Sequence, residues 1–226
     1  MAAQANGFSV GRVEVVFAEE GWKEVPLPDT AQSYGGDKWG ALSVQVKLYV
    51  RAARDGSEPV YVMVSANSHG LGGGRSGYMT YSPDCKSDDE LYREGNSGFS
   101  LRFAQCLLVA PRYTTESILQ SLAPQVKPLR ESGAVPMASA VYAVWSRHAI
   151  STGSFVDVRV FTANPIDSDQ SADVKGLPDG VPSAHVTWGR QLSDAVKSSV
   201  YSLSGRLSIP PIRTVPPAPR GPTFQG

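Results

Sequence analysis

The chain has 226 residues with 21 basic and 21 acidic side chains, so its formal net charge is zero. This length suits one large all-β domain, or a domain with a long tail, that buries roughly two thirds of its unfolded surface. The balanced charge excludes broad binding of nucleic acid through its phosphates, and we expect any such contact to be local or weak. Because the N-terminus lacks the basic and apolar segments of a signal peptide, and no apolar run approaches a membrane span, we expect a soluble, unsecreted chain.

Alternating side chains predict three strands in the first part of the chain. Residues 13–17 form the first, with valines on one face. Residues 42–50 give the clearest alternation, since every second residue is aliphatic, and the pattern resumes in residues 60–66. The polar run between them contains Asp55-Gly56, which is typical of a tight turn. We therefore expect two antiparallel neighbours with one buried face over a common core.

The middle of the chain is irregular before the alternation returns. Residues 67–97 are rich in Gly, Ser, Asp and Tyr, and loops of this length in compact domains usually carry a function. Residues 99–109 predict a strand with a bulge or bend near Ala104, ended by Pro111. Residues 114–122 begin with threonines that suit an N-cap and space their aliphatic side chains as a short helix does.

The last predicted strand pair comprises residues 141–147 and 155–161. In the second strand Val156, Val158 and Val160 face the core. Beyond this pair the composition changes to Asp, Ser, Pro and Gly, which predicts a domain boundary. The predicted organisation is an N-terminal arm (1–9), a jelly-roll β-sandwich (10–165) and a C-terminal extension with a Pro-rich tail (166–226).

Residues 188–203 are the ambiguous segment of that extension. Leu192, Val196 and Leu203 are spaced as on one face of a helix, but neighbouring serines and β-branched residues weaken this prediction. The final residues, 209–226, contain six prolines and no acid, which favours an extended tail lying on a surface.

Two patterns resemble known functional loops but lack their context. The letters of residues 72–77 match a dinucleotide fingerprint after a strand, yet no helix follows and no acid stands at the expected distance, so a flexible loop is favoured. Residues 95–98 resemble the serine loop of trypsin-like proteases, with His69 and an Asp-Asp pair before it. Only 28 residues separate His69 from Ser97, whereas those enzymes place the two on separate barrels. We therefore predict no catalytic residue.

Metal and disulfide chemistry are not predicted either. The three histidines are scattered, without a ligand at a short metal-binding spacing, so we interpret them as solvent-facing or hydrogen-bonded. They are His69, His148 and His185. The acidic run 84–94 lacks the residue order of a calcium loop. Cys85 and Cys106 are too few for a disulfide framework and are interpreted as thiols. The sequence thus assigns no metal-ligating residue, no cofactor-binding residue and no cofactor.

Three stretches carry a resemblance to a known family. They are residues 39–51 with the strand 60–64, residues 98–111, and residues 140–165. Their order resembles that of the jelly-roll capsid proteins of picorna-like plant viruses, in particular the small subunit of the comovirus (secovirid) type. The ending Thr223-Phe224-Gln225-Gly226 also resembles the junctions cut by picorna-like cysteine proteases, although a cleaved product would stop at Gln225.

The resemblance implies a structural, non-enzymatic role. Such a subunit is cut from a polyprotein made in the host cytoplasm and resides in the virion. It assembles with copies of itself, or with sister coat proteins, into an icosahedral shell around an RNA genome. A neutral chain fits a subunit that contacts the packaged RNA weakly or indirectly, since phosphate binding needs clustered Lys or Arg. No membrane partner is implied.

Two alternatives stay open at this point. A ligand-binding β-sandwich, such as a carbohydrate-binding module, would use Trp22, Trp39 or Tyr78 on a loop face. A non-catalytic subunit of a larger complex is the other alternative. The sandwich fold does not choose between these functions, because one fold hosts many of them.

Overall fold

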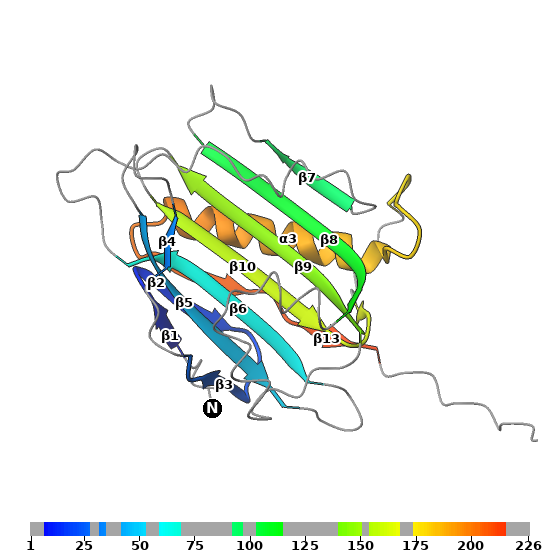
Figure 1. Cartoon of the computed structure of the whole chain (residues 1–226), viewed down its shortest axis with the longest axis horizontal. Helices are drawn as coiled ribbons and strands as arrows, with labels where there is room; N and C mark the ends of the chain where they lie inside the picture. The colour runs from blue at the N-terminus through cyan, green and yellow to red at the C-terminus, as the bar shows by residue number, and fades with distance from the viewer. Residues whose placement is uncertain are drawn as a thin grey trace, which may run out of the picture.

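A large antiparallel sheet dominates the computed structural model of the chain (Figure 1). The structure describes residues 7–27, 32–34, 42–52, 59–68, 92–96, 103–114, 140–150, 154–167 and 174–215. The sheet has eight strands in the order β3-β5-β6-β10-β9-β8-β7, with β4 paired to β5. The all-β, antiparallel sandwich expected from the sequence is confirmed.

The strands of the large sheet include those with the strongest alternation in the sequence. They are β3 (Trp22–Val25), β4 (Gln32–Tyr34), β5 (Leu42–Arg51), β6 (Val60–Asn67), β7 (Tyr92–Asn96), β8 (Phe103–Thr114), β9 (Ala140–Ile150) and β10 (Phe155–Thr162). The predicted neighbours β5 and β6 pair antiparallel, as do β9 and β10. β10 also pairs with β6, which joins the two hairpins into one sheet.

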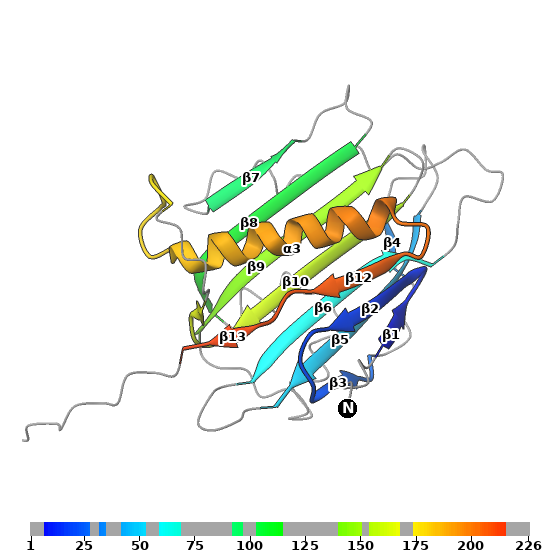
Figure 2. The same cartoon turned by 180° about the vertical axis from the view of Figure 1, so that it is seen from behind.

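A second layer covers one face of this sheet (Figure 2). Helix α3 (Ser183–Tyr201) packs against β8, β9 and β10. A three-stranded sheet made of β1 (Gly7–Val10), β2 (Val13–Phe17) and β12 (Arg206–Ile209) lies beside the helix, and β1 contacts β5 and β6. β11 (Ile166–Asp167) pairs with β13 (Arg213–Thr214). We call the covered face of the large sheet the helix face, and the other the opposite face.

The sequence of α3 explains why it lies on the sheet. Its buried residues recur every three or four positions, which gives the helix one apolar stripe. They are His185, Val186, Trp188, Gly189, Leu192, Ser193, Val196, Ser199 and Val200. The ambiguous segment 188–203 is therefore helical as far as Tyr201, and Leu203 lies beyond the helix end.

Residues 174–215 belong to the sandwich, which differs from the extension predicted after residue 165. β12 runs parallel to β2, and Ile212 is completely buried. The guanidinium of Arg51 donates a hydrogen bond to the carbonyl of Ile212. The physical reason is that α3 and β12 supply the apolar layer without which the helix face would meet water. The predicted arm 1–9 likewise contains most of β1.

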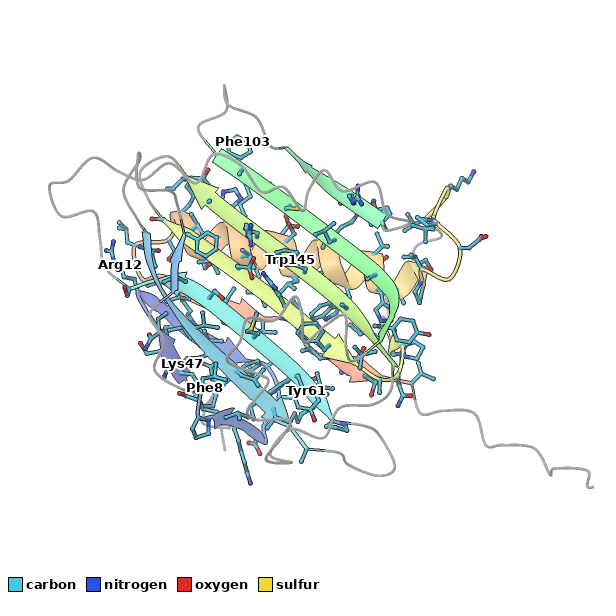
Figure 3. The ribbon with its side chains drawn as sticks, in the orientation of Figure 1. Phe8, Arg12, Lys47, Tyr61, Phe103 and Trp145 are labelled. Carbon is cyan, nitrogen blue, oxygen red and sulfur yellow. The ribbon has the colours of Figure 1, made fainter. Side chains whose placement is uncertain are left out.

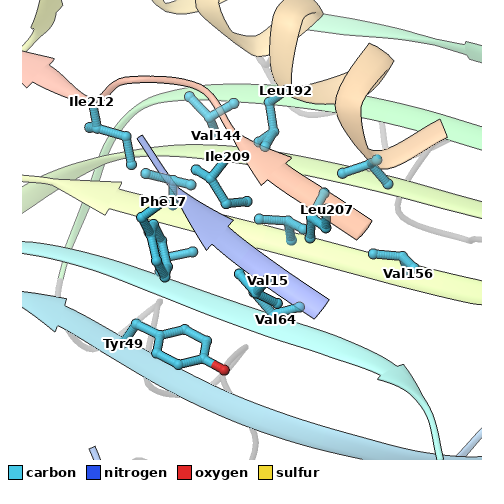
Figure 4. Close-up of a cluster of buried hydrophobic side chains, with 14 of the residues drawn as sticks. Val15, Phe17, Tyr49, Val64, Val144, Val156, Leu192, Leu207, Ile209 and Ile212 are labelled. Carbon is cyan, nitrogen blue, oxygen red and sulfur yellow. The ribbon is translucent and has the colours of Figure 1, made fainter. Parts of the chain in front are cut away.

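The core fills the space between the two layers (Figure 4). Its buried side chains come from both layers, including Val15, Phe17, Tyr49, Val64, Val144, Val156, Leu192, Leu207, Ile209 and Ile212. Tyr49 is one of the residues that alternate with the aliphatic ones in 42–50, so the single buried face predicted for this strand leaves it on the solvated side, but it is fully buried. Its ring lies 4.7 Å from that of Phe8 and 5.3 Å from that of Phe17. β5 thus has two covered faces, because the small sheet covers the face predicted to be solvated.

β8 also differs from its prediction. It continues through Pro111 to Thr114, and its register against β9 shifts between Ala110 and Tyr113, not near Ala104. A bulge accommodates a residue without an N–H, so the strand can resume after the proline.

Two other predicted segments lie largely outside the described residues. Of the helix predicted at 114–122, the structure describes only Thr114, which ends β8. The described part of the region 67–97 includes strand β7. Within the described ranges, no helix is long and apolar enough to span a membrane.

Candidate functional site

A buried ionic cluster occupies the opposite face of the large sheet. Asp157 on β10 lies opposite Arg147 on β9, and Arg159 lies opposite Trp145. One carboxylate oxygen of Asp157 accepts hydrogen bonds from Trp145 Nε1 at 2.5 Å and from Arg147 Nε at 2.7 Å. The other accepts one from Arg159 Nε at 3.1 Å. Trp145 lies near the middle of the sheet (Figure 3).

The charges of this cluster are removed from water but compensated. The side chains of Asp157, Arg147 and Arg159 are only 1%, 6% and 12% exposed. Burial alone would raise the pKa of Asp157, but the nearby guanidiniums of Arg159 and Arg147 and the hydrogen bonds from Trp145 and Arg147 outweigh it and lower that pKa. The carboxyl group is therefore an anion at neutral pH, unsuited to act as a proton donor.

Cation–π contacts complete the cluster. The guanidinium carbon of Arg159 lies 4.0 Å from the centre of the Trp145 ring, and that of Arg147 lies 4.9 Å from it. Arg147 also lies 5.5 Å from the ring of Phe155. These contacts and the shared carboxylate fix both arginines in place. The arrangement ties β9 to β10, so its chemistry is structural.

Two histidines are buried on the helix face. His148 on β9 is 1% exposed and His185 on α3 is 0% exposed. Burial lowers the pKa of each to about 4, with a contribution at His148 from the charge of Lys197. Nε2 of His185 accepts a hydrogen bond from the backbone N–H of Ile166 at 3.3 Å, whereas neither ring nitrogen of His148 has a partner among the described residues. The prediction of solvent-facing or hydrogen-bonded histidines is wrong for His148 and holds for His185 only through this bond.

A solvent-facing ion pair ties α3 to the edge strand β7. Arg190 Nε donates a hydrogen bond to Glu94 at 2.8 Å, and a second guanidinium nitrogen donates to the Tyr92 hydroxyl at 2.8 Å. The hydrogen bond from Arg190, followed by that from Tyr92, lowers the pKa of Glu94 despite its partial burial. Such exposed pairs contribute little to stability, so this one mainly fixes the position of the edge strand.

The turn after α3 presents apolar side chains to solvent. Leu203 is 109% exposed and Tyr201 is 55% exposed. The turn is nevertheless well ordered by hydrogen bonds. Ser202 donates its N–H to the Ser198 carbonyl at 2.9 Å, Ser204 donates its N–H to the Ser202 hydroxyl at 3.2 Å, and Gly205 donates its N–H to the Ser202 carbonyl at 3.2 Å. The turn therefore holds a leucine in water in a fixed position.

The residues weighed in the sequence do not form a site in the part that the structure describes. Trp22 is 3% exposed and stacks on Phe17 at 4.2 Å, so it belongs to the core and offers no face to a ligand. The other residues weighed for ligand binding or catalysis lie outside the described ranges. They are Trp39, Tyr78, His69, Ser97, the loop 72–77 and the acidic residues 84–91.

The prediction that both cysteines are thiols is wrong for Cys106. It is disulfide-bonded, and the only other cysteine in the sequence, Cys85, lies outside the described residues. Cys106 is opposite Arg147 in the β8–β9 register, so the disulfide lies beside the ionic cluster. Two cysteines are too few for a framework, but one pair is enough for one bond.

Sequence reasoning missed the ionic cluster because it is assembled across strands. The signal was present, since Trp145 and Arg147 alternate on one strand as Asp157 and Arg159 do on the next. Only the register that places Asp157 opposite Arg147 shows that the charges compensate each other.

Among the described residues, no three His, Cys, Asp or Glu side chains lie close enough to hold a metal ion. No family model matches this chain, and comparisons with curated proteins and with solved structures find no significant similarity.

Proposed function

We propose that the protein is a structural subunit that works by association, as a capsid protein does. In this proposal it assembles with copies of itself, or with sister coat proteins, into an icosahedral shell around an RNA genome, and it resides in the virion. The strand order that resembles the picorna-like capsid proteins motivates the proposal. The observation that carries it is the ordered turn that presents Leu203 and Tyr201 to solvent.

An exposed leucine on a mobile loop needs no explanation, but this one is held by its turn. Burying a leucine side chain is favourable by about 1.5–3 kcal/mol. Because the turn is already ordered, an interface that buries this leucine does not lose part of that free energy to the entropy of ordering the turn. The neighbouring Tyr201 adds an aromatic side chain with a polar tip, a residue type that is enriched in interfaces. This turn therefore has the properties of a preorganised contact.

Edge strands offer a second kind of contact. Among the described strands β1 pairs with β2 alone and β7 with β8 alone, so each has backbone groups on its other side that a neighbouring subunit could pair with. The closed symmetry of a shell would use such edges in the same way on every copy. The neutral net charge fits a subunit that contributes little to neutralising RNA.

Association of the purified full chain tests the proposal. We expect light scattering to show particles or oligomers that grow with concentration, alone or with the sister coat proteins, and negative-stain electron microscopy to show closed isometric particles. Leu203→Ser should weaken association by about 10- to 150-fold, the equivalent of 1.5–3 kcal/mol per contact. The matched control Val215→Ser removes another exposed apolar side chain and should leave association unchanged.

Two results would overturn the proposal. One is a monomer at every concentration, with and without the sister proteins. The other is equal weakening by Leu203→Ser and Val215→Ser, which would indicate general surface hydrophobicity and not a specific contact at the turn.

A further inference from the structure

The two buried histidines lie at opposite ends of the contact between helix α3 and the sheet. His185 belongs to the first turn of the helix, and its ring lies 4.8 Å from the ring of Tyr142 on β9. His148 lies on β9, with its ring 5.4 Å from that of Tyr201, the last residue of the helix. The helix therefore covers the sheet with an imidazole at each end of the contact.

The surroundings of both imidazoles favour the neutral form. Nε2 of His185 accepts the N–H of Ile166, which it can do only while that nitrogen carries no proton. Protonation would turn it into a donor that faces another donor. The ring of His148 contacts two aromatic rings, those of Phe103 at 5.8 Å and Tyr201 at 5.4 Å. Among the described residues, neither of its nitrogens has an acceptor for a second N–H.

The groups that the described residues place around His148 offer no negative charge. On β8 the opposite residue is Gln105, whose amide donates to the Ser193 hydroxyl of α3 at 3.1 Å. On β10 the opposite residue is Val156. The adjacent Arg147 belongs to the ionic cluster on the other face of the sheet, and from α3 the charge that acts on the ring is that of Lys197. A proton on His148 would therefore gain no ion pair with these groups, and burial and the charge of Lys197 would both oppose it.

His185 is similarly surrounded. It faces Tyr142 on β9 and the backbone of Ile166 on β11. The neighbouring acid on β11, Asp167, has an exposed side chain and sits opposite Arg213 on β13. No ion pair to either buried histidine is present among the described residues.

We propose that α3 is an acid-released cover of the sheet, and that protonation of His148 and His185 detaches the helix and exposes the apolar helix face. This property belongs to the single subunit and does not depend on shell assembly. Geometry and burial agree with the lowered pKa of both rings, about 4 in the closed form against about 6.5 for an exposed histidine. The open form therefore binds protons first. Stability of the closed form is complete above pH 6.5 and is lost as the pH falls towards 4.

The size of the effect follows from the same values. A difference of about 2.5 pKa units per histidine multiplies the opening equilibrium by up to about 300 for each ring that titrates. We expect hydrogen–deuterium exchange of α3 amides, corrected for the intrinsic pH dependence, to rise by this order between pH 7 and pH 4. Amides of the central strand β6 should stay protected in the same range, because every residue of β6 is buried.

Variants separate this proposal from general acid unfolding. His148→Phe keeps an aromatic ring without a titrating group, and His185→Gln keeps an acceptor for Ile166. The double variant should move the midpoint of α3 opening down by at least about one pH unit. Lys197→Glu places a negative charge near His148, which raises the pKa of that ring in the closed form and also lowers the midpoint. The matched control His69→Gln removes the third histidine and should change nothing.

The proposal is overturned if α3 and β6 lose protection at the same pH in the wild type, since the helix would then not open alone. An unchanged midpoint in the double variant would overturn it as well. If that variant does not fold, Lys197→Glu decides alone, because an exposed lysine on the helix surface tolerates substitution, and an unchanged midpoint there refutes the role of His148.

Discussion

Replacing Asp157 by asparagine removes the carboxylate that two buried arginines share. Asparagine has nearly the same shape, but only one of its two terminal atoms can accept a hydrogen bond. If its oxygen keeps the bonds from Trp145 and Arg147, its NH₂ group faces the Nε donor of Arg159. Both guanidiniums then lose their buried counter-charge. Breaking a buried pair in this way costs about 3–5 kcal/mol, which corresponds to a loss of roughly 6–20 °C in Tm for a chain of this size.

Urea denaturation followed by circular dichroism and tryptophan fluorescence measures this cost. The matched control is Glu24→Gln, which breaks the Lys47–Glu24 pair at 2.9 Å, with side chains 23% and 38% exposed. An exposed pair contributes about 0–1 kcal/mol, so the control should stay within that range. We argue that the buried arginines destabilise the fold once their shared carboxylate is removed. If Asp157→Asn lowers the free energy of unfolding by less than about 1 kcal/mol, as little as the control does, this argument is refuted.

Three further predictions concern packing and the disulfide. A Cβ on Gly189 of α3 would lie 3.0 Å from Leu107 and 3.2 Å from Val144. We therefore expect Gly189→Leu to lower the free energy of unfolding by about 1–3 kcal/mol through overpacking, whereas Gly189→Ala stays near neutral because alanine favours the helix. Gly11 has φ +55° and a Cβ there would lie 2.4 Å from the Asn67 carbonyl, so Gly11→Ala should cost at least about 2 kcal/mol in a thermal or urea melt. Alkylation of the denatured, unreduced protein followed by mass spectrometry should find no modified cysteine, and any labelling of Cys106 would contradict the disulfide.

The sequence predicted the strands that obey a simple alternation. Residues 42–50, 60–66 and 155–161 are long enough for the period of two to stand out from chance, and the structure places β5, β6 and β10 there. Short strands such as β3 and β12 have four residues each, too few to show a period. Their pairing is decided by the strands next to them in space, which the sequence pattern does not contain.

The second layer was the main gap in the prediction. Tyr49 alternates with aliphatic residues and therefore looked solvent-facing, but Phe8 of β1 and Phe17 of β2 cover it. β12, from the other end of the chain, completes the sheet to which these two strands belong. Contacts between residues so distant in sequence leave no local signal. α3 was only partly visible for a different reason. Ser193 and Ser199 are buried polar residues in its apolar stripe, and Ser199 satisfies its hydroxyl by donating to the carbonyl of Val196 at 2.8 Å.

The buried titratable groups are charged on the opposite face of the sheet and neutral on the helix face. The two faces should therefore lose stability at different pH values as acid is added. On the opposite face, Asp157 is charged and its pKa is lowered, so its stabilising effect is fully present above the unfolded-state pKa of about 3.9 and is lost only at lower pH. On the helix face, His148 and His185 are neutral, and their penalty develops between pH 6.5 and about 4. Acid should therefore weaken the contact between α3 and the sheet before it weakens the bond between β9 and β10. A state near pH 4 with a protected sheet and an exchanging helix follows from this difference, and Asp157→Asn should remove the second stage of acid unfolding while it leaves the first in place.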